Sequence, residues 1–106
     1  MKSADAAKLF DCLSSETRLD IYRLLVRQGE AGMFAGDIAR RLDVPPSSLS
    51  FHLKELVHAG LLSVVQEGRF MRYRADLPLM HGIVAYLSEE CCVDQSAQGH
   101  GAARRC

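Results

Sequence analysis

Three of the four cysteines lie within the last sixteen residues, and this group has the clearest chemical meaning in the sequence. Cys91 and Cys92 are adjacent, and Cys106 is the final residue. Thiolates are soft ligands that select thiophilic ions. Three of them match a trivalent centre with a lone pair, such as arsenite or antimonite, which takes three ligands in a pyramid. Gly99 and Gly101 would let the intervening chain fold back and bring Cys106 to the pair.

The same residues admit other chemistry. With His100, the three cysteines would satisfy a four-coordinate zinc site, although their spacing resembles no common zinc motif. The thiols could also act as a redox switch, or they could be incidental in a polar tail. Cys12 lies beside the apolar stripe of the first predicted helix, so we expect a small buried hydrophobe there rather than a ligand.

A second set of chemically useful side chains lies on a predicted helix that begins near Pro46 and is closed by Gly60. Its apolar stripe consists of Leu49, Leu53, Leu56 and Val57. The residues that fall off this stripe and face outward are Ser47, Ser48, Phe51, His52 and Lys54. Short polar donors, one aromatic ring and one cation at the start of a helix are suited to entering the major groove of DNA N-terminus first.

Neighbouring segments would position this face. Residues 36–42 have helical spacing, and the stretch Asp43-Val44-Pro45-Pro46 ends that helix because proline disfavours helix in the residue before it. Two helices alone could be an ordinary αα-hairpin with solvated serines. However, residues 61–65 and 70–74 alternate on either side of the turn Glu67-Gly68-Arg69, which predicts a β-hairpin. A helix-turn-helix followed by a basic hairpin is a winged helix.

The hairpin would act as the wing of that fold. We expect Arg69 and Arg72, at or near its tip, to contact phosphates or the minor groove beside the reading helix. Residues 31–75 contain six basic and four acidic residues although the whole chain has a formal net charge of zero. Positive charge is therefore modestly concentrated on the proposed DNA face.

Further helices are expected on either side of the winged helix. One covers residues 3–13, and a second begins after Ser14 as N-cap and runs to about Gln28. A short connector at 31–35 contains an extended segment at Met33–Phe34. The last helix starts at Asp76-Leu77-Pro78 and reaches Glu90 or the cysteines.

The first and last helices are predicted to form a homodimer. The stripe Leu79, Ile83 and Leu87 is expected to meet its symmetry mate and the first helix. Two recognition helices would then reach successive major grooves about 34 Å apart. The alternative is that the terminal helices complete a monomeric core.

Composition excludes several classes of protein. No apolar run is long enough to span a membrane or to form a signal peptide, so we expect a cytoplasmic location in which thiols stay reduced. The serines and histidines form no arrangement with a paired base, and no glycine-rich phosphate loop is present. We therefore expect no enzymatic activity.

The sequence resembles the ArsR/SmtB family of winged-helix repressors over roughly residues 6–92. The segments that resemble it are LFDCLSSETRLDIYRLL, GDIARRLDVPPSSLSFHLKELVHAGLL and QEGRFMRYRAD. The resemblance implies a homodimer that binds double-stranded operator DNA and is released by an inducer. The family's recognition-helix positions fall here on Ser47, Ser48, Ser50, Phe51 and His52.

The ending ECC resembles a subgroup whose arsenite ligands lie at the C-terminal end of the last helix, with a third cysteine in the tail. Many arsenic-sensing relatives instead carry a cysteine pair at the first helix of the helix-turn-helix, where this chain reads MFAGDIA. The sequence therefore predicts a repressor that leaves DNA on binding arsenite or antimonite through Cys91, Cys92 and Cys106. A redox-switched repressor and a zinc-stapled interaction module without DNA binding are the alternatives.

The predicted fold class is mainly α (α+β). We expect a winged helix-turn-helix with a β-hairpin wing and N- and C-terminal dimerisation helices over residues 1–92, followed by a flexible tail at 93–106 that carries one cysteine ligand.

Overall fold

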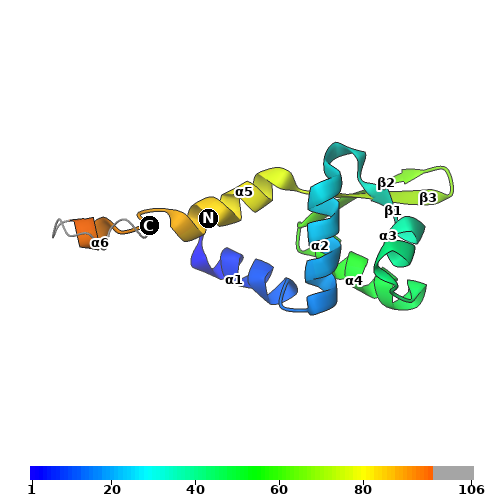
Figure 1. Cartoon of the computed structure of the whole chain (residues 1–106), viewed down its shortest axis with the longest axis horizontal. Helices are drawn as coiled ribbons and strands as arrows, with labels where there is room; N and C mark the ends of the chain where they lie inside the picture. Colours follow the sequence, from blue (N-terminus) through cyan, green and yellow to red (C-terminus); the bar gives the residue numbers. More distant parts are fainter. Residues whose placement is uncertain (97–106) are drawn as a thin grey trace.

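A computed structural model describes residues 1–96 (Figure 1). Six α-helices, one 3-10 turn and three strands make up this part of the chain. In chain order they are α1 (Ser3–Cys12), α2 (Glu16–Gln28), η1 (Gly29–Ala31), β1 (Met33–Phe34), α3 (Ala35–Leu42), α4 (Pro46–His58), β2 (Leu62–Glu67), β3 (Phe70–Ala75), α5 (Leu77–Ser88) and α6 (Val93–Ser96). The predicted winged helix, mainly helical with a hairpin wing, is confirmed.

Helix α2 lies at the centre of the core. Its side chain cap is Ser15, whose Oγ accepts a hydrogen bond from the backbone N–H of Arg18. The prediction of Ser14 as the cap was wrong by one residue, because the Ser14 hydroxyl instead donates to the carbonyl of Asp11 at the end of α1. Ile21 and Leu25 of α2 are fully buried and share one cluster with residues of α3, α4 and α5.

The helix-turn-helix formed by α3 and α4 follows from its local sequence. Asp43 adopts a left-handed conformation with φ 54° and ends α3. Pro46 occupies the first turn of α4, where its missing N–H leaves no helical bond unmade. After Ala59, Gly60 turns the chain away with φ 83°, in the position that glycine favours after a helix.

The sheet is antiparallel with strand order β1-β3-β2. Glu67 pairs with Phe70, so the wing has a two-residue turn whose first member, Gly68, has φ 63°. The extended segment at Met33–Phe34 was predicted correctly, and it adds a third strand by pairing with β3. Gly32, just before it, has φ 60°, and a Cβ there would collide with the carbonyl oxygen of Tyr73, so only glycine fits this position.

Helix α5 starts as predicted but ends earlier. The Asp76 carboxylate accepts a hydrogen bond from the Leu79 N–H at 2.9 Å and caps its first turn. The helix ends at Ser88, and Glu89 is already extended, so the prediction that it reaches Glu90 or the cysteines was wrong. A short helix, α6, lies at the start of the segment that was predicted to be a flexible tail.

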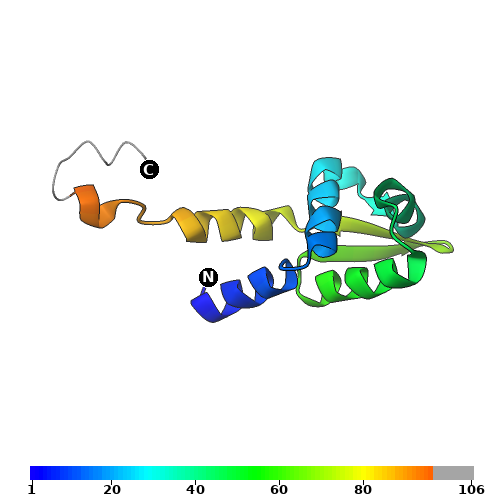
Figure 2. The ribbon, with the colours of Figure 1, turned by 60° about the horizontal axis from the view of Figure 1, so that its bottom comes forward.

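Helices α1 and α5 project from the same side of the winged helix, away from the wing (Figures 1 and 2). The hydroxyls of Ser3 and Tyr86 join them at 2.6 Å. Ile83 is 7 % exposed and belongs to the chain's own core, whereas Leu87 is 64 % exposed. The predicted stripe therefore divides between an inner face of α5 and an outer face.

Candidate DNA-reading face and thiol site

Helix α4 is oriented by three leucines. Leu49, Leu53 and Leu56 are nearly inaccessible, and they turn the opposite side of the helix to solvent. The exposed residues on α4 that were predicted to face DNA are Ser47, Ser48, Ser50, Phe51 and Lys54. The structure thus brings these five side chains onto one helix, at a surface open to a duplex.

His52 is placed differently from its neighbours, because it is only half exposed. Its Nδ1 lies 3.3 Å from Nη1 of Arg18 on α2, and Arg18 Nε donates to the carbonyl of Cys12 at 2.6 Å. A guanidinium can only donate, so in this hydrogen bond Nδ1 is the acceptor and Nε2 is left as the ring nitrogen that can donate. Arg18 therefore ties the end of α1 to α4 and orients the imidazole, a role that sequence reasoning missed.

Phe51 is the one large apolar residue on the exposed side of α4 among the described residues. Its side chain is 58 % exposed. The ring meets that of His52 at 5.7 Å between centroids and at 65°, an edge-on contact of the kind aromatic pairs favour.

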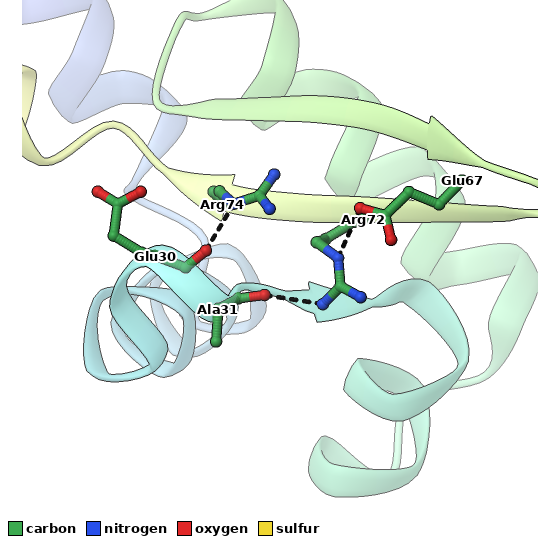
Figure 3. Close-up of polar contacts among 5 residues, drawn as sticks. All are labelled: Glu30, Ala31, Glu67, Arg72 and Arg74. Carbon is green, nitrogen blue, oxygen red and sulfur yellow. Dashed lines mark hydrogen bonds and ion pairs between the residues drawn. The ribbon is translucent and has the colours of Figure 1, made fainter.

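The two wing arginines differ in their surroundings. Arg69 is the second residue of the hairpin turn and is exposed, and its guanidinium has no hydrogen bond or ion pair with any residue in the described part of the chain. Arg72 donates through Nε to Glu67 Oε2 at 2.7 Å and through Nη1 to the carbonyl of Ala31 at 2.8 Å (Figure 3). It also lies 4.2 Å from the centre of the Phe34 ring.

These contacts fasten the wing to the rest of the domain. The hydrogen bond from Arg72 holds the pKa of Glu67 below its ordinary value, and the same bond raises the pKa of Arg72. Arg74 adds a second link, because its Nε donates to the carbonyl of Glu30 at 2.6 Å (Figure 3). Residues of β3 thus hold η1 and β1 beside the wing.

Cys91 and Cys92 lie just beyond α5, and their sulfurs are 3.6 Å apart. Adjacent helical residues would point about 100° apart. Here the chain has left the helix, and Glu90 and Cys92 take left-handed conformations with φ 57° and 64°. Cys91 is a free thiol, whereas Cys92 is disulfide-bonded, so the separation is that between a thiol sulfur and a disulfide sulfur. Cys92 could ligate an ion as a thiolate only after that disulfide is reduced.

The third predicted ligand, Cys106, and the alternative ligand His100 lie outside the described residues. Among residues 1–96, no three cysteine, histidine or carboxylate side chains are grouped so as to hold a metal ion. The structure therefore describes two of the proposed sulfur ligands.

Cys12 is separate from this pair. It is half-buried against the core, and its thiol lies 3.8 Å from the carbonyl oxygen of Glu55 on α4. Burial is the main cause that raises the pKa of this thiol, so the thiolate form is disfavoured. These surroundings agree with the small buried hydrophobe predicted from the sequence.

Comparison with known proteins identifies the family. A helix-turn-helix domain family matches residues 13–65. The arsenical resistance operon repressor of Bacillus subtilis (strain 168) is 30 % identical over 92 residues, which cover 87 % of this chain and 83 % of that protein. The chain belongs to the ArsR/SmtB family of winged-helix transcriptional regulators. It is a regulator with a DNA-binding helix-turn-helix.

Other relatives of this ArsR-family regulator agree. A cadmium resistance transcriptional regulatory protein CadC homolog from Staphylococcus aureus is 32 % identical over 72 residues, 68 % of this chain but only 58 % of that protein. An ArsR-like transcriptional regulator from Rhodococcus sp. RHA1 superposes with a TM-score of 0.71 at 33 % identity, covering 90 % of this chain and 86 % of that one.

A solution structure from Mycobacterium bovis, described as a homodimeric winged helix-turn-helix DNA-binding domain, has a TM-score of 0.65 at 25 % identity and covers 83 % of this chain and 82 % of that one. All four relatives are described as regulators, repressors or DNA-binding domains, in keeping with the expectation that this chain is not an enzyme. Over the described residues, no helix has the length and apolar character needed to cross a membrane.

Proposed function

We propose that this ArsR-family regulator is a homodimeric repressor that releases operator DNA when arsenite or antimonite binds Cys91, Cys92 and Cys106. The observation that carries the proposal is the pair of sulfurs 3.6 Å apart directly after α5. The similarity to a repressor of an arsenical resistance operon supports this class of inducer. With the disulfide of Cys92 reduced, the pair would supply two soft ligands, and Cys106 would supply the third.

The proposed DNA contacts come from α4 and the wing. Ser47, Ser48, Ser50, Phe51, His52 and Lys54 would meet base edges and phosphates in the major groove, and Arg69 and Arg72 would meet the backbone or the minor groove. His52 would present Nε2–H to an acceptor such as guanine N7 or O6, since Arg18 occupies Nδ1. Exposure of this face supports the assignment.

The proposed dimer uses the outer faces of α1 and α5. Phe10 on α1 is 40 % exposed, and Val84 and Leu87 on α5 are 59 % and 64 % exposed. Apolar side chains on two neighbouring helices would gain from burial against a second copy. The homodimer described for the Mycobacterium bovis relative supports this arrangement. Residues 1–92 would then form the DNA-binding and dimerisation domain, and residues 93–106 the ligand-bearing tail.

Inducer binding would act through the end of α5. Joining Cys106 to the pair fixes the tail against the dimerisation helix, and it favours whichever dimer geometry best accommodates that closure. A dimer whose two α4 helices no longer match successive major grooves would release DNA.

The test is an arsenite titration of the protein–operator complex followed by fluorescence anisotropy. We expect full release by the parent protein and none by the Cys91→Ser, Cys92→Ser double variant, which should still bind DNA. Release of the double variant by arsenite would refute the site. If the parent protein binds the operator but arsenite does not release it, the proposed inducer is wrong, and the proposed role as a DNA-binding repressor is unaffected.

Zinc is the second candidate ligand, with His100 as the fourth donor. Titration with zinc in place of arsenite separates these ligands, and metal analysis of the purified protein shows whether zinc is already bound. If peroxide under metal-free conditions releases the DNA and dithiothreitol restores binding, the thiols act as a redox switch instead.

A further inference from the structure

The exposed ring of Phe51 requires an explanation, because the rest of its helix face is polar. Its side chain is 58 % exposed, and the exposed residues before it are Ser47, Ser48 and Ser50. An aromatic side chain has a large apolar surface, and leaving it in water forgoes the free energy of burying it. Such a residue at the centre of a surface that binds another molecule is expected to be covered on binding.

The ring of Phe51 is held before any partner arrives. It packs edge-on against His52, whose Nδ1 accepts from Arg18, and Arg18 is itself bound to the carbonyl of Cys12. Arg18 of α2 and the carbonyl of Cys12 at the end of α1 thus fix His52, the immediate neighbour of the ring. Pre-positioning of this kind lowers the entropy lost on binding and makes the contact geometrically selective.

The major groove offers few apolar features to such a ring. Most of its base-edge groups are hydrogen-bond donors or acceptors, which a phenyl ring cannot satisfy, and the exception is the 5-methyl group of thymine. We infer that Phe51 reads a thymine methyl group in each half of the operator. This rests on the proposed role of α4 as the reading helix, and it specifies which base and which atom one side chain recognises.

The wing provides an internal comparison. Phe70 is about as exposed as Phe51, at 60 %, but its ring contacts that of Phe34, with centroids 5.4 Å apart and ring planes tilted by 41°. It lies at the start of β3, on a hairpin that would follow the backbone or the minor groove, where no thymine methyl is presented. An exposed phenylalanine is therefore not sufficient to recognise a thymine methyl group; the side chain must also lie on α4, the helix proposed to enter the major groove.

The experiment replaces thymine with uracil, which removes only the methyl group. The operator is first obtained by selecting duplexes from a random pool with the parent protein. Each thymine of one half-site is then changed in turn to deoxyuridine, and affinity is measured by fluorescence anisotropy. We expect one position at which uracil weakens parental binding about fourfold, the factor that corresponds to about 0.8 kcal/mol for one buried carbon.

The variant Phe51→Ala should bind the thymine and uracil duplexes equally, whereas Phe70→Ala should keep the fourfold difference. Phe51 is exposed, so the variant should fold, and circular dichroism checks this. A parent protein indifferent to uracil at every position would overturn the inference, as would a uracil effect that persists in Phe51→Ala. If Ser47→Ala, Ser48→Ala and Phe51→Ala all leave affinity unchanged, α4 is not the reader and the proposed DNA face itself fails.

Discussion

At the DNA-reading end, α4 is anchored by buried leucines, and Arg18 joins its face to residues distant in the sequence. At the opposite end, beyond α5, Cys91 and Cys92 lie in a short segment with left-handed backbone at Glu90 and Cys92, and Cys92 is also disulfide-bonded. The first arrangement depends on tertiary packing, and the second on the conformation and covalent bonding of a short segment.

This structural difference suits the two proposed tasks, which are DNA recognition at α4 and inducer sensing beyond α5. A surface that recognises a rigid duplex gains affinity when its side chains are already in place. A sensing segment must instead change when its ligand binds, because a ligand can shift an equilibrium only through different interactions with the two states. Changes at the thiol end should therefore alter the response to inducer, and changes at the reading end should alter DNA affinity itself.

The largest expected effect is at the thiol end. Cys91→Ser and Cys92→Ser each remove one of three soft ligands, and a hydroxyl is a poor substitute for a thiolate on arsenite. Both variants should bind operator DNA like the parent and fail to release it with arsenite. Cys106→Ser should respond weakly, since the adjacent pair would still anchor the ion. Anisotropy titrations of the variants measure all three responses.

Cys12→Ser is the matched control, because its thiol is half-buried against α4 and distant in sequence from the pair. It should release DNA like the parent. If only Cys12→Ser fails to release DNA with arsenite, the inducer binds at α1 and not at the cysteines beyond α5.

The next largest effect should come from α5, the helix that lies between the winged helix and the thiol segment. Leu87→Glu would place a carboxylate in the proposed dimer interface, where an unpaired charge is strongly unfavourable. Sedimentation should detect monomers, and operator affinity should fall by at least tenfold because one protomer contacts only one half-site. Leu19→Glu, at a comparably apolar exposed site on α2, should remain dimeric. A dimeric Leu87→Glu would exclude the outer face of α5 from the interface.

At the reading end, His52→Ala should weaken operator binding by about 1–3 kcal/mol if its Nε2–H contacts a base edge. Arg18→Ala should weaken binding less, since the imidazole remains but loses its partner on Nδ1. Isothermal titration with operator DNA gives both affinities, with circular dichroism to check folding. Parental affinity in both variants would contradict the assignment of His52 to the reading face.

Sequence patterns predicted what depends on neighbours along the chain. The proline at the start of α4 and the start of α5 at Asp76 are signals of this kind, as is the turn of the wing, which was predicted one residue too long because Glu67 pairs with Phe70. The patterns could not predict the contact of Arg18 with His52, which are separated by 34 positions. Nor can periodicity distinguish a face buried within one chain from a face buried between two, so the structure of one chain was needed to place Ile83 in that chain's own core.

The wing allows a finer comparison, between an arginine beside the tip and one bound to the domain. Each phosphate contact contributes about 0.9 to the slope of log affinity against log salt. Arg69→Ala should lower the slope by this amount and leave stability unchanged. Arg72→Ala should lower the slope and also loosen the wing, because Glu67 and Ala31 lose their donor. Weaker binding by Arg72→Ala with a parental slope would mean that Arg72 only positions the wing.

The smallest expected effect is a pH dependence of the wing itself. Arg72 lowers the pKa of Glu67 in the folded protein, so their pairing stabilises the fold above the ordinary pKa of the carboxyl group. This contribution is lost as the pH falls through the folded-state value, when the carboxylate is protonated. Both side chains are partly exposed to solvent, so the change should be small and weaker still in high salt. Denaturant unfolding of the parent and of Glu67→Gln from about pH 7 to about pH 3 should give two curves that converge at acid pH. A constant difference between them would mean that ionisation of Glu67 contributes nothing, and that packing of Arg72 on Phe34 holds the wing instead.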